Sequence, residues 1–148
     1  MSLVSFGVEL EATTEETWEV VCDPRNLPQW DRHIVEVEGV PKTGLAAGMR
    51  YTTVMKFLAV RARVACAVLE WEPPRRSVIH LSGLLEATVS TTVTSLPGHC
   101  CWLEHEIDYV FHGGHLGELA ARSLRLLGGP QFALRHGTLA QKRQIEGG

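Results

Sequence analysis

His105 has the clearest capacity for chemistry in this sequence, because its imidazole stands between apolar neighbours in residues 102–111. The segment alternates, with apolar side chains and His105 on one face and three carboxylates on the other, which is typical of a half-buried antiparallel strand. A partly buried imidazole can act as an acid, a base or a hydrogen-bond donor. Tyr109 shares this face, so His105 and Tyr109 are the candidate catalytic pair. The competing interpretation is structural, with His105 as a core histidine bonded to a hydroxyl such as that of Thr91 or Tyr109.

Two further groups of residues, a His-Gly-Gly-His segment and the cysteines, could be taken for metal sites, but neither has the spacing that a metal site requires. Residues 112–115, His-Gly-Gly-His, contain two imidazoles, but no carboxylate or cysteine joins them at ligand spacing and a turn explains the glycines. The cysteines lack the spacing of a zinc site and are expected to behave as small hydrophobes. The sequence contains no Ser-His-Asp order, phosphate-binding glycine loop or catalytic carboxylate pair. It therefore predicts neither a metal site nor a cofactor.

The composition indicates one globular domain spanning residues 1–148. Hydrophobic residues make up 45% of the chain and charged residues 21%, as in ordinary folded proteins. The formal net charge of -3 argues against a nucleic-acid partner, which requires a basic surface. The sequence has no apolar run of about 18 residues to span a membrane and no visible signal peptide. A cytoplasmic protein with reduced thiols is expected, and a homodimer stays open.

Two short helices are predicted near the N-terminus, after a first strand at residues 3–11. Thr13 and Glu16 form a capping-box signature, in which a hydroxyl and a carboxylate satisfy free backbone N–H groups. A helix is therefore expected at residues 14–22. A second short helix is expected at residues 24–30, because proline suits its first turn.

Strands and one long helix make up the remainder. Alternating or β-branched segments predict strands at residues 34–40, 49–57, 60–71, 77–81, 84–96 and 102–111. From Leu116 to Ile145 the apolar spacing is helical, with a kink at residues 128–130, and a continuous helix of that length would measure about 45 Å. This order indicates an α+β fold, in which an antiparallel sheet of six to seven strands curves around a long C-terminal helix. The gap between sheet and helix is a natural place for a ligand.

Five segments stand out by their order and spacing, namely residues 12–21, 23–30, 70–76, 113–119 and 139–146. Together they resemble the START-like, helix-grip superfamily, in particular its polyketide cyclase/dehydrase and lipid-transport branch. The resemblance covers essentially the whole chain. It implies a deep hydrophobic cavity that stores, carries, folds or cyclises an apolar small molecule, although a shared fold does not define an activity.

The candidate ligand-binding residues lie on the predicted inner faces. They are Trp30, Tyr51, Thr53, Met55, Phe57, Val64, Cys66, Val89, Thr91, Leu103, Ile107, Leu119, Ala120 and Ser123. Trp30 is included because of the resemblance, which implies a cover over a ligand or over the core. The other positions follow from periodicity, and a register slip of one residue would turn Glu104 and Glu106 inward in place of His105.

Some neighbouring residues are interpreted as lying outside the site. Asp31 and His33 are expected to be loop residues with no visible partner. Trp71 and Trp102 are expected on the outer face of the sheet or at its rim. The acidic face of residues 102–111 is interpreted as solvated.

Two functions fit these residues, and a third is weaker. The first is binding of a hydrophobic small molecule (aromatic, polyketide-like or lipid-like) in secondary metabolism, since apolar residues outnumber titratable ones on the predicted wall. The second is a polyketide cyclase or dehydratase, in which His105, helped by Tyr109, moves a proton while the cavity folds a reactive chain. The third is a protein-interaction domain. His105→Phe separates the first two, because it removes turnover and spares binding if the second is correct.

Overall fold

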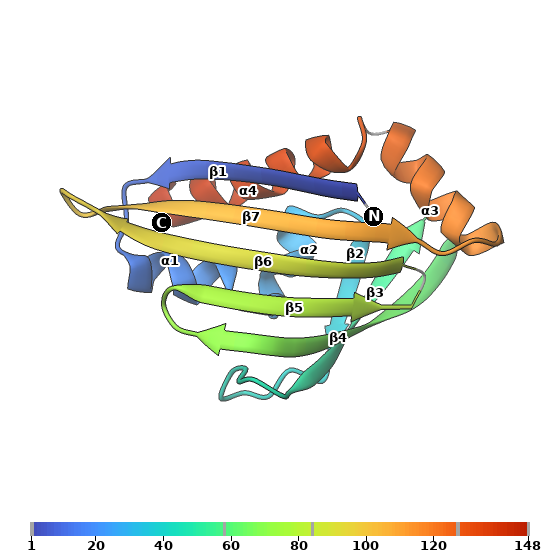
Figure 1. Ribbon diagram of the computed structural model, residues 1–148, viewed down its shortest axis with the longest axis horizontal. Helices are drawn as coiled ribbons and strands as arrows, with labels where there is room; N and C mark the ends of the chain where they lie inside the picture. The colour runs from blue at the N-terminus through green and yellow to red at the C-terminus, as the bar shows by residue number, and fades with distance from the viewer. Residues whose placement is uncertain (1, 58, 84, 127, 148) are drawn as a thin grey trace.

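The computed structural model describes residues 2–57, 59–83, 85–126 and 128–147, and its strands form one antiparallel sheet (Figure 1). The strands are β1 (Ser2–Leu10), β2 (Ile34–Glu38), β3 (Arg50–Phe57), β4 (Val60–Glu72), β5 (Arg76–Ser82), β6 (Leu85–Leu96) and β7 (Cys100–Phe111). The helices are α1 (Thr14–Val21), the 3-10 helix η1 (Pro24–Asn26), α2 (Leu27–Trp30), α3 (His115–Leu126) and α4 (Pro130–Gly147). The seven strands lie in the order β1-β7-β6-β5-β4-β3-β2. This arrangement confirms the predicted α+β fold.

The short helices begin where the sequence predicts, because their caps are formed. The backbone N of Glu16 donates to Oγ1 of Thr13 over 3.1 Å, and the backbone N of Thr13 donates to Oε1 of Glu16 over 3.2 Å. Asp23 caps η1 in a similar way, accepting from the backbone N of Arg25 over 3.1 Å. The predicted second helix is therefore a 3-10 turn that continues into the single α-turn of α2.

The C-terminal segment forms two helices, α3 and α4, which corrects the expectation of one long kinked helix. Gly128 and Gly129 between them have φ angles of 99° and 90°. These angles are left-handed, a conformation that glycine adopts without a steric penalty and that commonly ends a helix. Helix α4 runs along β1, whereas α3 turns away at the end of β7 (Figure 1). Among the described residues, no helix is both long enough and apolar enough to cross a membrane.

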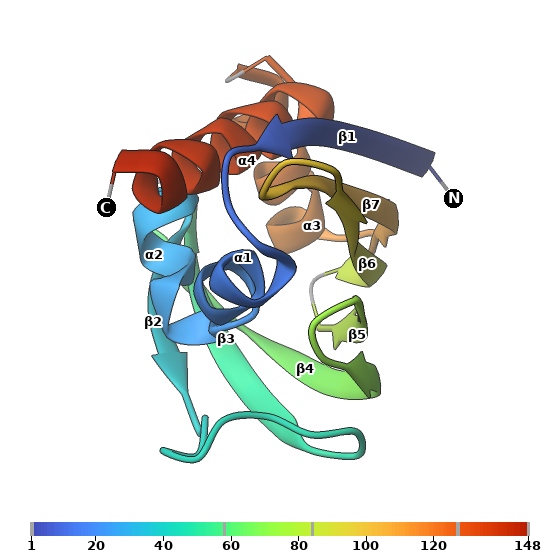
Figure 2. The ribbon, with the colours of Figure 1, turned by 90° about the vertical axis from the view of Figure 1, so that its left-hand side faces the viewer.

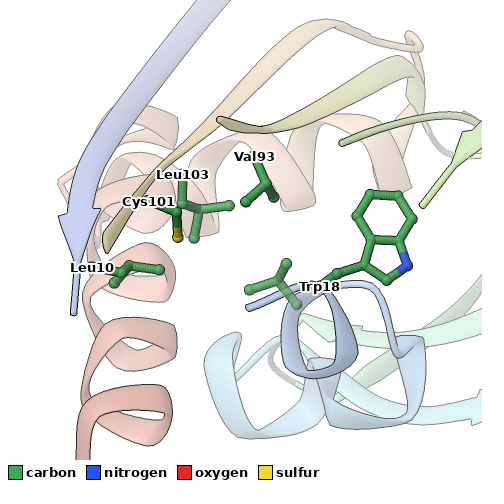
Figure 3. Close-up of a cluster of buried hydrophobic side chains, with 6 residues drawn as sticks. Leu10, Trp18, Val93, Cys101 and Leu103 are labelled. Atoms are coloured by element: carbon green, nitrogen blue, oxygen red, sulfur yellow. The ribbon is translucent and has the colours of Figure 1, made fainter. Parts of the chain in front are cut away.

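Among the described residues, the core consists of three clusters of buried side chains. The first packs α1 against β1, β6 and β7 (Figure 3), and contains Leu10, Trp18, Val21, Val93, Cys101 and Leu103. The second contains Leu45, Tyr51, Cys66 and Val68. The third lies beneath α3 and contains Phe57, Val64 and Ala120. The first and third clusters close opposite ends of the curved sheet, and Figure 2 shows the short helices inside the curve with α4 across its open side.

Trp71 points inward, which corrects the expectation of an outer or rim position. Its ring packs edge-on against Trp18 with the ring centroids 5.1 Å apart. The cause is a register shift between Val68 and Glu70 in the β4–β5 pairing, because an extra residue in a strand reverses the faces of the residues that follow. Trp102 does lie outside, and it is 39% exposed.

Candidate ligand-binding site

A cavity of about 300 Å³ lies between the sheet and helices α2 and α4. The apolar side chains of the sheet that line it are Val4, Ile34, Met55, Phe57, Cys66, Trp71, Ile79, Leu81, Leu85, Ala87, Val89, Ile107 and Phe111. The opposite wall comes from α4 through Pro130, Ala133, Leu134, Gly137, Thr138 and Gln141. Among the described lining residues, Asp31 is the only carboxylate and there is no Lys or Arg. Such a wall accommodates neutral apolar molecules and disfavours charged ones.

Most residues predicted to face a ligand lie on this cavity. They are Trp30, Tyr51, Thr53, Met55, Phe57, Cys66, Val89, Thr91 and Ile107, together with the candidate pair His105 and Tyr109. The register explains this grouping, because Thr91 pairs with His105 and Val89 pairs with Ile107, and paired residues share a face. Their contact with a ligand stays a prediction.

Four predicted wall residues lie in the core instead. Val64, Leu103 and Ala120 are each 0% exposed and belong to the clusters at the two ends of the sheet, and Leu119 packs against the cluster of Ala120. These side chains do point inward, but α1 covers Leu103 and α3 covers Val64. Alternation within a strand cannot predict which helix covers which end. The side chain of Ser123 lies outside the described part of the structure.

One stretch of the cavity wall is a polar chain of three buried side chains. Oγ1 of Thr91 lies 2.9 Å from Nδ1 of His105, and Nε2 of His105 lies 2.7 Å from Oε1 of Gln141. Since Oε1 carries no hydrogen, the Nε2–H of His105 donates to it, and Nδ1 accepts from the Thr91 hydroxyl. Gln141 was missed in the sequence, although its spacing from Leu134 and Thr138 places it on the inner stripe of α4.

Burial lowers the pKa of His105, and the hydrogen bond to Gln141 opposes this shift without cancelling it. The imidazole is therefore neutral at pH 7. Both ring nitrogens have a protein partner, so a proton transfer to or from a ligand must first break one of these hydrogen bonds. This arrangement matches the structural interpretation, in which Thr91 bonds the imidazole. Tyr109 lies on the same wall, with its ring edge-on to Phe111 at 5.9 Å between centroids.

Asp31 and His33 are loop residues, as predicted, but both line the cavity and bond to each other, which corrects the expectation that they have no partner. Nδ1 of His33 lies 3.2 Å from Oδ1 of Asp31, and the backbone N of His33 donates to the same oxygen over 2.9 Å. The buried ring also stacks on Phe57 with the centroids 4.9 Å apart. The sequence signal for this contact is the spacing of two residues, at which Asp commonly bonds a backbone N–H.

Trp30 connects α2 to α4 at the cavity. Its Nε1 donates to Oε1 of Gln144 over 2.9 Å, and the residue is buried. Gly137 faces it, since a Cβ at that position would lie 3.5 Å from the carbonyl oxygen of Trp30. The indole of Trp30, which is predicted to cover a ligand or the core, is therefore held in place by α4.

The cavity thiols and one phenol are held in their neutral forms. Burial raises the pKa of Cys22 to about 12 and that of Cys66 to about 11, and it also raises the pKa of Tyr51. Thiols with such pKa values are poor nucleophiles and poor metal ligands at neutral pH. Within the described residues, no three His, Cys, Asp or Glu side chains are grouped to hold a metal ion.

Known proteins share this architecture over most of the chain. An uncharacterized protein of Mycobacterium tuberculosis is 26% identical over 132 residues, which cover 84% of this chain and 90% of that protein. A START superfamily protein of Mycobacterium smegmatis has a TM-score of 0.61 at 17% identity, covering 93% of this chain and 98% of the other. An aromatase/cyclase of Streptomyces sp. R1128 has a TM-score of 0.69 at 12% identity, covering 97% and 95%. These solved structures share the helix-grip fold. Residues 1–127 match the family described as polyketide cyclase/dehydrase and lipid transport, and the chain therefore belongs to this family.

Proposed function

We propose that this protein binds a neutral hydrophobic small molecule, aromatic, polyketide-like or lipid-like, in the cavity between the sheet and α4. The observation that carries the proposal is a cavity of about 300 Å³ with a mainly apolar wall and no Lys or Arg among the described lining residues. The description of the family supports the same class of ligand. The volume lies at the lower end of the roughly 300–1,000 Å³ typical of small-molecule sites, so the ligand is of the size of a few fused rings or a short acyl chain.

A polyketide cyclase or dehydratase activity is the alternative. Its support is the position of His105 and Tyr109 on the wall, because a neutral imidazole can act as a general base. The two hydrogen bonds of His105 favour binding without chemistry, since the imidazole must give up the Thr91 hydroxyl before Nδ1 accepts a proton. Binding is therefore the first candidate.

Equilibrium dialysis against fluorene, a neutral fused-ring hydrocarbon, tests the binding proposal. Val89→Phe adds a ring to the cavity wall from β6 and should weaken fluorene binding. Val110→Phe makes the same change at a side chain that is 42% exposed and should leave the affinity unchanged. Absence of binding in the wild type, or equal binding by both folded variants, would contradict the proposal.

The alternative needs a second test, with a reactive polyketide chain as the substrate. If the protein is a cyclase that uses His105, His105→Phe should still bind fluorene but should no longer accelerate cyclisation. Acceleration that persists in this variant would exclude His105 as the base. A wild type that binds the chain and leaves it unchanged would exclude the cyclase activity for that substrate.

A further inference from the structure

The amide nitrogen of Gln141 is a polar group on the cavity wall that a ligand can use. Oε1 of Gln141 accepts from His105, but no described residue accepts a hydrogen bond from its Nε2. Gln141 is only 6% exposed and lines the cavity. Every fully buried side-chain nitrogen or oxygen among the described residues has a partner, so this nitrogen retains some accessible surface, on a residue that lines the cavity. Its two hydrogens are donors on a mainly apolar wall.

The orientation of this amide is imposed by its neighbours. A glutamine amide can present either its oxygen or its nitrogen to a cavity, and the Nε2–H of His105 binds the oxygen. With the amide oxygen at Nε2, the hydroxyl of Thr91 donates to the unprotonated Nδ1 of His105. Thr91 and His105 therefore act as positioning residues, and the lowered pKa of His105 keeps the imidazole in the neutral form that this chain requires.

The remainder of the wall restricts what can accept from this donor. A carboxylate or phosphate would enter a space whose described lining contains no Lys or Arg and one carboxylate, Asp31. An unpaired buried charge is far more costly than a buried neutral carbonyl that receives a hydrogen bond. The complementary ligand group is therefore an uncharged acceptor such as a ketone, ester or amide carbonyl.

We infer that Gln141 is the ligand-recognising residue of the cavity, and that the ligand is an apolar molecule presenting a neutral carbonyl to its amide N–H. This inference rests on the proposed binding function and adds the chemical class of the ligand. It also assigns His105 and Thr91 the task of orienting Gln141 in place of proton transfer.

The test compares fluorene with 9-fluorenone, which has nearly the same shape and adds one carbonyl. In the wild type, fluorenone should bind at least as tightly as fluorene, because the hydrogen bond offsets the desolvation of the carbonyl. Gln141→Met removes the donor at similar length, and it should shift the ratio of the two dissociation constants about 2- to 10-fold against fluorenone. The infrared carbonyl stretch of bound fluorenone should lie at lower frequency in the wild type than in Gln141→Met.

Two further variants separate recognition from packing. The first variant is Thr138→Val. Thr138 lies on the same helix and lines the cavity, but its hydroxyl already donates to the carbonyl oxygen of Leu134 over 2.8 Å. It should leave the fluorenone-to-fluorene ratio unchanged. His105→Phe removes the donor that holds the oxygen of Gln141. The carbonyl band of bound fluorenone should then broaden or move to higher frequency, while fluorene still binds. A general loss of structure would instead weaken the binding of both compounds.

The outcomes distinguish this inference from the function on which it rests. If fluorene binds but the ratio is the same in the wild type and Gln141→Met, the inference is wrong and the binding function stands. If 9-hydroxyfluorene gains affinity over fluorene while fluorenone does not, the amide presents its oxygen, which also overturns the inference. If neither fluorene nor fluorenone binds the wild type, the proposed function fails and the inference fails with it. The wild-type infrared band can also be compared with that of fluorenone in an apolar solvent, above which it should not lie, so a misfolded Gln141→Met does not prevent a decision.

Discussion

The burial of His105 predicts a specific dependence of stability on pH. Desolvation lowers the pKa of the folded residue below the ordinary value of 6.5. When the pH falls, the unfolded chain takes up a proton at this histidine before the folded protein does. The stabilisation is therefore present above about pH 6.5 and is lost as the pH falls towards the folded pKa. Substituting His105→Gln, which keeps a polar group but cannot titrate, should remove this dependence.

The size of the effect follows from proton linkage. Between about pH 7.5 and about pH 5.5, a histidine that stays neutral in the folded protein reduces the free energy of unfolding by at most about 1.4 kcal/mol. A difference of about 1 kcal/mol between wild type and His105→Gln is expected over this interval. Carboxylates whose pKa the fold lowers, such as Glu16 and Glu146, lose their contribution at lower pH and are common to both proteins.

Urea unfolding at several pH values measures this difference. Thr138→Val is the matched control, because it alters a buried residue of α4 that does not titrate, and its pH dependence should follow the wild type. If wild type and His105→Gln lose the same stability between the two pH values, His105 is not held neutral by burial. The donation from the Thr91 hydroxyl to Nδ1, which requires a neutral imidazole, would then be wrong as well.

Three other substitutions test the fold. Gly129→Ala should lower the free energy of unfolding in urea by about 1–2 kcal/mol, because φ is 90° at this position. Gly113→Ala is the control and should change stability little, because its backbone is not left-handed. Equal effects would contradict the glycine break between α3 and α4. Thr13→Ala should lower the free energy of unfolding by about 0.5–2 kcal/mol and lower the Tm, because it removes the capping box of α1. An unchanged Tm would show that the capping box does not stabilise the helix. Leu103→Ala should lower the free energy of unfolding by about 2–5 kcal/mol, because Leu103 lies in the core. The folded variant should keep the fluorene affinity of the wild type. A selective loss of affinity would place Leu103 on the cavity wall.

Much of the fold could be predicted because its signals are local. The alternation of residues 102–111 places His105 on the inner face of β7. The capping box of Thr13 and Glu16 likewise marks the start of α1, since both partners lie within one turn. The glycines before Pro130 indicated a kink but not the full separation of α3 from α4.

The incorrect predictions concern contacts between segments, which the sequence of a single segment does not specify. Trp71 faces inward because the pairing of β4 with β5 includes a register shift, which depends on both strands. Leu103 points towards the cavity side but is covered by α1, and Val64 is covered by α3, so neither could be separated from true wall residues by periodicity. The spacing of Gln141 indicates the inner stripe of α4, but its contact with His105 depends on how α4 packs against β7.

The most direct test of the central claim is native mass spectrometry of the protein purified from its own organism, compared with the denatured mass. The native protein should be heavier by one neutral apolar compound, denaturation should release this compound, and its infrared spectrum should contain a carbonyl band. Val110→Phe should retain this compound and Val89→Phe should lack it. Equal native and denatured masses, in a wild-type protein that also fails to take up fluorene, would contradict the assignment of the cavity as a binding site.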